Sequence, residues 1–295
     1  MFRGCTGAVL VCVLASCGGS APSNGAGPDG GTPDGASLVV DTDWLEARLG
    51  DPDVQLVDTR SSGYDEARIP GAIQLAPAEL TANVDGVASQ IAPPMQAQPV
   101  LREAGLREGV IAVVYGASPQ YDPGRIVWAL SYYGHADVRY LDGGYAAWVA
   151  ANGAIDTDPP AIESTDYTIV GVVDKLRVTG DWVLSQLGDA PYDMPAIQLV
   201  DARSDGEYAS GHIPSARSVN WTRNLDDGFL RSEPDLDALY EGMDPTMTTV
   251  TYCTTGWRGA FAWLILTELG YDDVRLYDGS WSEWGNAELP VEPMQ

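Results

Sequence analysis

The sequence predicts an α/β protein built from tandem duplicated domains, each a mainly parallel sheet flanked by helices. Short β-rich runs such as Val110–Tyr115 and Thr248–Tyr252 alternate with helix-like runs such as Arg125–Tyr133 and Arg258–Leu269, and this alternation is typical of parallel sheets. Motifs of the first half also recur in the second half. Because ligands of parallel sheets bind at the carboxyl ends of the strands, we expect the functional site at such an end.

The internal repeat sets the domain organisation. Val54–Arg60 (VQLVDTR) recurs as Ile197–Arg203 (IQLVDAR), and Asp137–Gly144 (DVRYLDGG) recurs as Asp273–Ser280 (DVRLYDGS). The copies lie about 140 residues apart, far beyond the period of a solenoid, so a whole domain was duplicated. The predicted units are a first domain at 38–153, a Pro- and Asp-containing linker at 154–166 and a second domain at 167–295.

The first 37 residues predict an export signal followed by a tether. A basic start and the apolar run Ala8–Leu14 precede Leu14-Ala15-Ser16-Cys17, which resembles the lipobox of bacterial lipoproteins. The resemblance implies a signal peptide at 1–16 and a lipid on Cys17, anchoring the exported protein to the bacterial cell envelope; an ordinary signal peptide is the alternative. Residues 17–37 are rich in Gly and Pro and cannot order themselves by apolar burial.

Composition excludes several classes of partner. The formal net charge of −26 argues against nucleic acid and anionic membrane surfaces, and leaves the lipid anchor as the only expected membrane contact. An anionic substrate would need a local positive pocket. Because His135 and His212 are the only histidines, we expect no metal site, and no cofactor is expected.

One cysteine stands out between a strand-like and a helix-like run. The chain has four cysteines; export would remove Cys5 and Cys12 and acylate Cys17, which leaves Cys253 as the only free thiol. At a helix N-terminus, unpaired N–H groups and the helix dipole favour thiolate over thiol. Gly256 lets successive amides turn toward the sulfur. The alternative is that Cys253 is a small buried apolar residue.

The neighbours of the cysteine suit an anion. Arg258 is a candidate clamp for an oxyanion, because guanidinium presents a fork of donors, although it could be a surface arginine. Thr254 and Thr255 could add hydroxyl donors or merely cap the helix. Trp257 could wall the pocket or pack into the core.

Other polar residues are better explained as structural support. Asp201 and Arg203 lie at a strand end near the loop, yet Asp58 and Arg60 repeat them in a domain that has no cysteine. His212 is interpreted as a hydrogen-bonded structural histidine rather than a general base.

The ordered motifs resemble the rhodanese family. They are Asp201–Arg203, Glu207–Pro214, Cys253–Arg258 and Asp278–Trp281, and the best match is the two-lobed thiosulfate sulfurtransferases. The resemblance implies a catalytic second lobe and a first lobe without the nucleophile. In this sequence the cysteine position of the first lobe falls on Gly116, so that lobe is expected to be scaffold and one wall of the cleft. Ser118 or Arg125 could still touch substrate.

The resemblance also implies the chemistry. Cys253 would attack the sulfane sulfur of thiosulfate, expel sulfite and pass the persulfide sulfur to a thiophilic acceptor, cyanide or a thiol. Cysteine phosphatases and arsenate reductases have five residues between cysteine and arginine, whereas four separate Cys253 from Arg258, which favours sulfur transfer. A persulfide carrier or sulfur-relay binding protein remains the alternative. The short 201–213 segment lacks the additional arginine expected for 3-mercaptopyruvate, which makes that donor less favoured.

Overall fold

The computed structural model describes Met1 and residues 37–158, 161–192 and 195–293. The predicted signal peptide, the lipidation site Cys17 and the tether therefore lie outside the described residues, except for Met1 and Ser37. Among the helices of the described part, none is long and apolar enough to cross a membrane.

The first lobe is a five-stranded sheet in which all neighbouring strands are parallel, in the order β1-β7-β6-β2-β3. These strands are β1 (Val39–Val40), β2 (Val54–Asp58), β3 (Ile73–Gln74), β6 (Ile111–Tyr115) and β7 (Asp137–Leu141). Its other elements are the helices α1 (Thr42–Glu46), α2 (Pro94–Glu103), α3 (Asp122–Tyr132) and α4 (Gly144–Ala150), the 3₁₀ helix η1 (Pro77–Leu80), and the hairpin β4 (Thr81–Val84) with β5 (Val87–Ile91).

The second lobe repeats this architecture with the order β10-β9-β13-β14-β8. Its sheet contains β8 (Arg177–Val178), β9 (Gln198–Asp201), β10 (Arg217–Ser218), β13 (Thr249–Tyr252) and β14 (Val274–Tyr277). The remaining elements are α5 (Gly180–Leu187), α6 (Asp205–Ala209), α7 (Glu233–Leu239), α8 (Trp257–Glu268), α9 (Ser280–Trp284), η2 (Asp174–Leu176), η3 (Trp221–Asn224) and the hairpin β11 (Leu225–Asp226) with β12 (Phe229–Leu230). Read from its other edge, the first sheet has the order β3-β2-β6-β7-β1, which corresponds strand by strand to the order of the second sheet. This correspondence confirms the predicted duplicated α/β fold.

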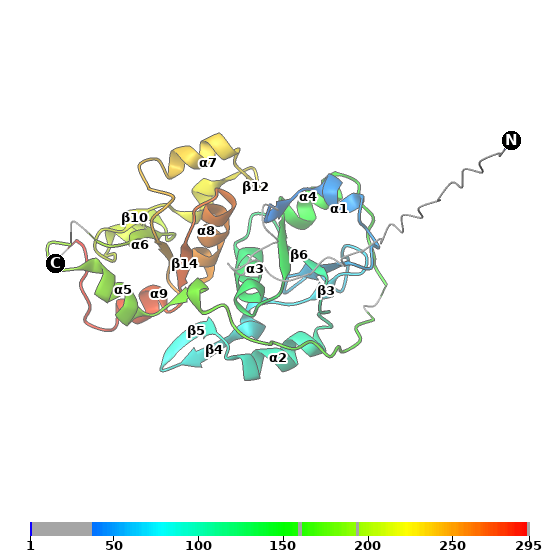
Figure 1. Cartoon of the computed structure of the whole chain (residues 1–295), viewed down its shortest axis with the longest axis horizontal. Coiled ribbons are helices and arrows are strands. Elements are labelled where there is room, and N and C mark those ends of the chain that lie inside the picture. Colours follow the sequence, from blue (N-terminus) through cyan, green and yellow to red (C-terminus); the bar gives the residue numbers. More distant parts are fainter. Residues whose placement is uncertain (2–36, 159–160, 193–194, 294–295) are drawn as a thin grey trace.

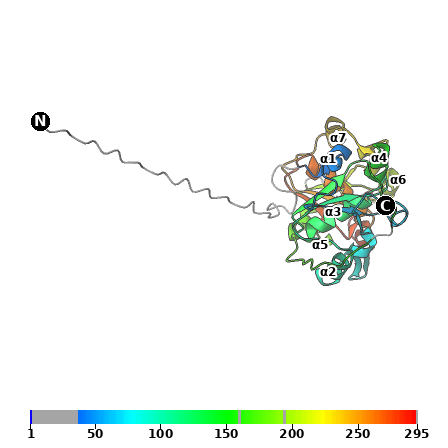
Figure 2. The same ribbon diagram turned by 90° about the vertical axis from the view of Figure 1, so that its right-hand side faces the viewer.

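Helices cover both faces of each sheet, which explains why the central strands are continuous apolar runs. All four residues of β13 are buried, as expected for a parallel strand with helices on both sides. In the first lobe, α2 and α3 share one core cluster, while α1 and α4 share another. Figure 2 shows α1 and α2 at opposite ends of this lobe.

The lobes meet along α3 and α8, which make the most extensive helix–helix contact in the described chain. These helices lie side by side in the middle of the molecule (Figure 1). A Cβ at Gly124 would lie 2.8 Å from the Cα of Phe261, so glycine permits the close approach. One hydrophobic cluster includes residues of both helices and both sheets, and the two lobes therefore share a core.

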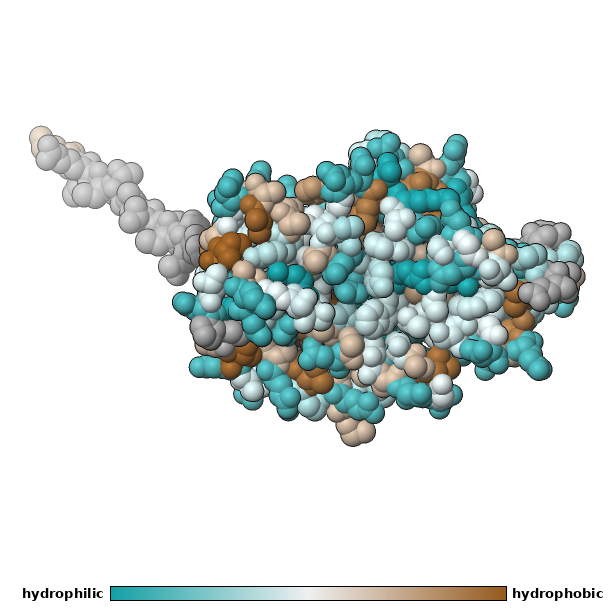
Figure 3. Space-filling model, turned by 180° about the vertical axis from the view of Figure 1, so that it is seen from behind, coloured by the Kyte–Doolittle hydropathy of each residue, from teal (hydrophilic) through white to brown (hydrophobic). Residues whose placement is uncertain are grey.

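The segment that joins the lobes packs on the first one. Thr165 N–H donates to the Arg102 carbonyl (3.1 Å), and Val173 N–H donates to the Tyr132 carbonyl (2.8 Å). The Tyr167 ring lies against His135, with ring centroids 5.8 Å apart. The boundary predicted at residue 167 thus falls within a stretch that contacts the first lobe, and the sheet of the second lobe begins at Arg177. On the face seen in Figure 3, most of the surface is hydrophilic and apolar residues form small patches.

Candidate active site

Cys253 directly follows β13, between the carboxyl end of that strand and α8. It is free and 1% exposed, and it packs with Ala202 and Ala262 in a small cluster. Its N–H donates to Ser280 Oγ (3.2 Å), and its carbonyl accepts from Trp281 N–H (3.0 Å). The end of β13 and the first residues of α9 together fix the backbone of Cys253.

Ser280 adopts an unusual backbone conformation to make this contact. Its φ is +53°, in the left-handed region that non-glycine residues rarely adopt. The equivalent residue of the first lobe is Gly144, with a φ of +55°. A serine at this position costs strain but supplies the hydroxyl that receives the Cys253 N–H, a combination typical of functional sites.

The loop between the thiol and α8 depends on Gly256. This residue is the N-cap of α8 with a φ of +84°, and no side chain caps this end of the helix. Of the two roles considered for Thr254 and Thr255, hydroxyl donor or helix cap, capping of α8 has no hydrogen bond among the described residues. The N–H groups of the first turn and the positive end of the dipole remain for an anion beside the sulfur.

Arg258 forms the main polar network of the site with Glu207, a motif residue whose pairing with Arg258 the sequence analysis did not predict. Its Nη1 lies 2.8 Å from Glu207 Oε2 and its Nη2 lies 2.9 Å from Glu207 Oε1. Nη2 also donates to Thr254 Oγ1 (2.6 Å), which in turn donates to Glu207 Oε1 (2.9 Å). The network ties the cysteine loop to α6, and it fixes one guanidinium at the rim of the site.

The charges of this network stabilise one another. The Arg258 guanidinium holds the pKa of the Glu207 carboxyl well below its usual range, mainly through hydrogen bonds. Those bonds likewise raise the pKa of Arg258 against the opposing effect of burial, and the neighbouring Cys253 side chain raises it further. Arg258 therefore faces both the carboxylate and the sulfur. The Ser204-x-x-Glu207 spacing marks a capping box, a sequence signal that would have drawn attention to Glu207.

Trp257, the predicted wall residue, is only partly buried and belongs to none of the described core clusters. Trp221 of η3 instead packs on the cluster that contains Cys253. Its ring meets Tyr121 of the first lobe edge to face, with centroids 5.0 Å apart. Burial raises the pKa of the Tyr121 hydroxyl, and Asp122 raises it further against the lowering effect of Arg258. The first lobe thus contributes an aromatic wall near the thiol.

Arg125 of the first lobe lies behind the loop. Its Nη1 is 2.8 Å from Asp278 Oδ1, and both side chains are almost completely buried. Asp278 Oδ2 also accepts the N–H of Ile91 from the first lobe (2.7 Å). A Cβ at Gly256 would lie 2.9 Å from the Asp278 carbonyl oxygen and 3.2 Å from Arg125 Nη1. Arg125 therefore supports the loop through Asp278, in a position behind Gly256.

Gly116 occupies the position equivalent to Cys253. Tyr145 N–H donates to the Gly116 carbonyl (2.9 Å), as Trp281 N–H does to Cys253. A Cβ at Gly116 would lie 2.6 Å from Thr59 Oγ1 and 2.9 Å from Pro123 Cγ. Because even a methyl group would clash there, the first lobe has no room for a second thiol.

The two Asp/Arg pairs have the same geometry. In each lobe the arginine Nη2 lies 2.6 Å from the aspartate Oδ2, for Arg60 with Asp58 and for Arg203 with Asp201. Each guanidinium also donates to a carbonyl of the following segment and lies over an aromatic ring. Equal geometry in a lobe without a thiol supports the structural interpretation of Asp201 and Arg203.

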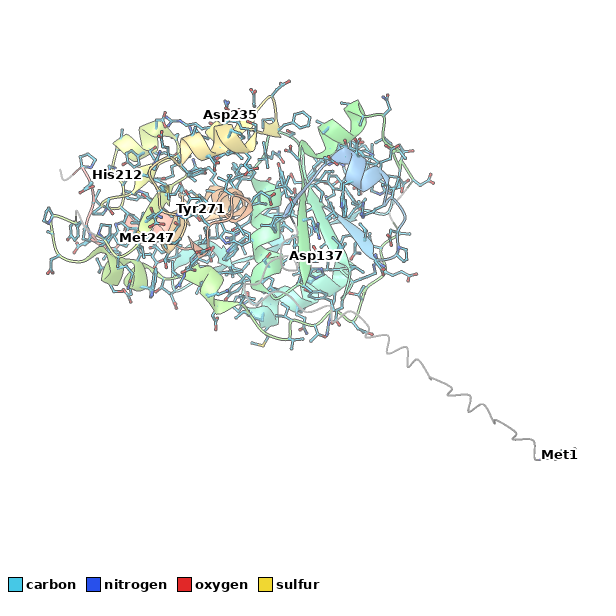
Figure 4. All side chains as sticks on the ribbon, turned by 45° about the horizontal axis from the view of Figure 1, so that its top comes forward. Met1, Asp137, His212, Asp235, Met247 and Tyr271 are labelled. Carbon is cyan, nitrogen blue, oxygen red and sulfur yellow. The ribbon has the colours of Figure 1, made fainter. Side chains whose placement is uncertain are left out.

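His212 also makes only structural contacts among the described residues. Its ring stacks on Tyr208 with centroids 3.7 Å apart, and its Nδ1 lies 3.0 Å from the Tyr208 carbonyl oxygen. Figure 4 places His212 at the outer end of the second lobe, away from the first lobe. A role as general base for Cys253 has no support in this geometry.

These features define a two-lobed α/β protein in which a free, buried cysteine lies between the end of a strand and the N-terminus of a helix, near an arginine. The family model for the rhodanese-like domain matches residues 41–151 and 179–287. The chain belongs to the rhodanese family of sulfurtransferases.

Individual relatives agree with this assignment. The chain is 33% identical to the thiosulfate sulfurtransferase of Pseudomonas aeruginosa, over 86% of this chain and 97% of the relative. It is 32% identical to the thiosulfate sulfurtransferase of Corynebacterium glutamicum, over 86% and 90% of the two chains. The crystal structure of SseA from Escherichia coli, a 3-mercaptopyruvate sulfotransferase, has the same fold, with a TM-score of 0.75 and 24% identity over 83% of this chain and 99% of SseA.

Proposed function

We propose that the protein transfers the sulfane sulfur of thiosulfate through a Cys253 persulfide to a thiophilic acceptor, cyanide or a thiol, and releases sulfite. The observation that carries this proposal is the position of the Cys253 thiol at the uncapped N-terminus of α8, beside Arg258. The names of the relatives support thiosulfate as the donor.

The first half-reaction follows from the loop. The Cys253 thiolate attacks the outer sulfur of thiosulfate, the S–S bond of thiosulfate breaks, and sulfite leaves with the electron pair. The persulfide anion that remains is stabilised by the amides at the start of α8 and by the charge of Arg258. In the second half-reaction the acceptor attacks the outer sulfur and the Cys253 thiolate returns.

Glu207 lowers the affinity of the site for anionic donors. Both terminal nitrogens of Arg258 are already bonded to this carboxylate, so an oxyanion that uses the same donors competes with it. The same feature favours the second candidate function, a persulfide carrier that receives sulfur from a partner and turns over thiosulfate slowly. The donor 3-mercaptopyruvate is less favoured, because the 201–213 segment lacks the additional arginine expected for its carboxylate and Arg258 is already bonded to Glu207.

Mass analysis of Cys253 after exposure to thiosulfate tests the proposal. We expect a gain of one sulfur atom and release of one sulfite per chain, followed by discharge when cyanide is added. Cys253→Ser should abolish both steps. A persulfide without turnover would favour the carrier, and hydrolysis of p-nitrophenyl phosphate without sulfur gain would refute sulfur transfer.

We also propose that the protein is exported and anchored to the cell envelope by a lipid on Cys17. The support is the Leu14-Ala15-Ser16-Cys17 sequence after an apolar run. Cys17→Ser protein should appear in the soluble fraction, and continued retention in the membrane fraction would contradict the anchor.

A further inference from the structure

A pocket of about 380 Å³ lies between the first lobe and the segment that joins the lobes. The first lobe contributes Gln55 of β2, Ile73 of β3 and Gly105 after α2, and the joining segment contributes residues 161–163. Gln55 and Ile73 stand at the amino ends of their strands, whereas Cys253 follows the carboxyl end of β13 in the other lobe. The pocket is therefore separate from the cysteine site, and its volume is typical of sites for small molecules.

One buried donor of this pocket has no partner. Arg68 lines the pocket and is 2% exposed. Its Nη2 donates to Asp156 Oδ2 (2.9 Å) and to the Asp158 carbonyl. Its Nη1 is also buried, and it makes no hydrogen bond with the described residues. Because an unpaired buried donor on a charged group is costly, Arg68 favours a ligand that brings an acceptor.

The walls of the pocket are held in place by hydrogen bonds. Arg68 N–H donates to the Asp156 carbonyl (3.0 Å), and Asp156 N–H donates to the Arg68 carbonyl (2.9 Å). Gln55 Nε2 donates to the Gly105 carbonyl (2.8 Å). A Cβ at Gly105 would lie 3.0 Å from the Glu163 carbonyl oxygen and 3.1 Å from Ile162 Cγ2. The joining segment thus lies directly on the first lobe, and the pocket is preformed.

The charges around the pocket restrict its ligand. Its charged residues are Arg68, Asp156 and Glu163 among the described residues that line it, one positive and two negative charges. The whole chain has a formal net charge of −26, so a simple anion is disfavoured. Asp156 already pairs with Arg68, whereas Glu163 is exposed and suits a cationic group. Ile73 and Ile162 add apolar surface to the walls.

We propose that this pocket binds a free α-amino acid with an apolar side chain. The carboxylate of the ligand accepts from Arg68 Nη1, its ammonium group donates to Glu163, and its side chain packs on Ile73 and Ile162. Such a zwitterion satisfies the buried donor without adding net negative charge. It also ties the joining segment to the first lobe, so binding should stabilise the folded chain.

Calorimetry with L-leucine and two of its analogues tests the chemistry of the ligand. We expect L-leucine to bind with a Kd below about 1 mM. The analogue 4-methylpentanoate lacks the ammonium group, 3-methylbutylamine lacks the carboxylate, and each should bind at least about tenfold more weakly. No binding heat at two temperatures, together with no shift of the urea midpoint at about 10 mM L-leucine, would overturn the proposal. Equal binding of either analogue would overturn it as well.

A pocket-filling variant tests the location. Ala161→Trp places an indole in the pocket, and Ala154→Trp is the matched control, because both alanines are exposed in the joining segment and only Ala161 lines the pocket. L-leucine should bind to wild type and Ala154→Trp but not to Ala161→Trp. Urea unfolding with a wild-type midpoint shows that both variants fold. Equal binding to the two variants would place the ligand elsewhere and refute the site.

Charge variants test the two polar contacts. Glu163→Gln should weaken L-leucine at least about fivefold and leave 4-methylpentanoate unchanged, whereas Asp166→Asn removes an equal exposed charge outside the pocket and should change neither. Arg68→Lys keeps the charge beside Asp156 but offers one nitrogen in place of two, so it should weaken L-leucine at least about tenfold and leave 3-methylbutylamine unchanged. If either variant affected L-leucine and the matching analogue equally, the proposed contacts would be wrong.

Discussion

Gly256→Ala is the change that most directly tests how the cysteine loop is held. The φ of Gly256 is +84°, and an added Cβ would lie 2.9 Å from the carbonyl oxygen and 3.0 Å from Oδ1 of Asp278. It would also lie 3.2 Å from Arg125 Nη1. These neighbours are backbone and a buried ion pair, so they cannot swing aside as the end of a flexible side chain would.

The expected cost has two parts. A left-handed φ costs alanine about 1 kcal/mol, and an extra carbon forced into a packed site adds about 1 to 3 kcal/mol. We expect the free energy of unfolding to fall by about 2 to 4 kcal/mol. The loop must move to relieve the contact, and a displacement of about 1 Å at a reacting group costs roughly 100-fold in rate. Persulfide formation should fall by about that factor.

Gly270→Ala is the matched control at the other end of α8. The φ of Gly270 is +79°, and nothing lies within 4 Å of an added Cβ. This variant should lose only the conformational part, about 1 kcal/mol, and keep the wild-type rate. Urea unfolding gives the free energies, and a single-turnover measurement of sulfite release gives the rates. Equal losses of stability, with a wild-type rate for Gly256→Ala, would show that the loop is not constrained by Asp278.

Three further predictions concern charges around the loop. Glu207→Gln should free Arg258 for oxyanions and lower the KM for thiosulfate by about 3- to 10-fold, whereas Asp205→Asn removes an equal charge from the same helix and should leave KM unchanged. Because the pKa of Glu207 is lowered in the folded state, its stabilisation is present above pH 4.5; the stability gap between Glu207→Gln and wild type in urea unfolding should close in stronger acid. Arg125→Met should lower the free energy of unfolding, measured with urea, by about 3 to 5 kcal/mol. The reason is that the buried Asp278 carboxylate would lose its main positively charged partner. Arg177→Met, which removes a partly exposed arginine 3.4 Å from the same carboxylate, should cost less; equal costs would contradict the buried ion pair.

The fold and the position of Cys253 at the end of a strand could be predicted because their signals are local. A β-rich run followed by a thiol and an apolar helix places Cys253 at a strand end, and repeated motifs reveal the duplication. The partner of Arg258 could not be predicted from spacing. Glu207 lies 51 residues away, and only the packing of α6 beside the loop brings the two side chains together.

The contacts between the lobes could not be predicted from the sequence either. Arg125 was named as a residue that could touch substrate, and the structure pairs its charge with Asp278, a residue from the other copy of the repeat. The sequence identified the Asp-Gly motif as framework without showing what the aspartate binds. Trp221 belongs to none of the motifs found in the sequence. It lies beside Cys253 because the chain turns toward the cysteine after β10 and forms η3 there.

The lobe without a thiol contributes to the candidate site through its contacts with the second lobe. It supplies Arg125 and the Ile91 N–H to Asp278, so without it a buried carboxylate behind the loop would lose its strongest partner. It covers Phe261 of α8 through α3, and exposing that face would destabilise the helix that begins four residues after Cys253. At the equivalent position of the first lobe, the side chains of Thr59 and Pro123 occupy the space that a Cβ on Gly116 would need. The candidate site is therefore shared by two lobes, in which one copy carries the Cys253 thiol and the other contacts Asp278 behind the loop.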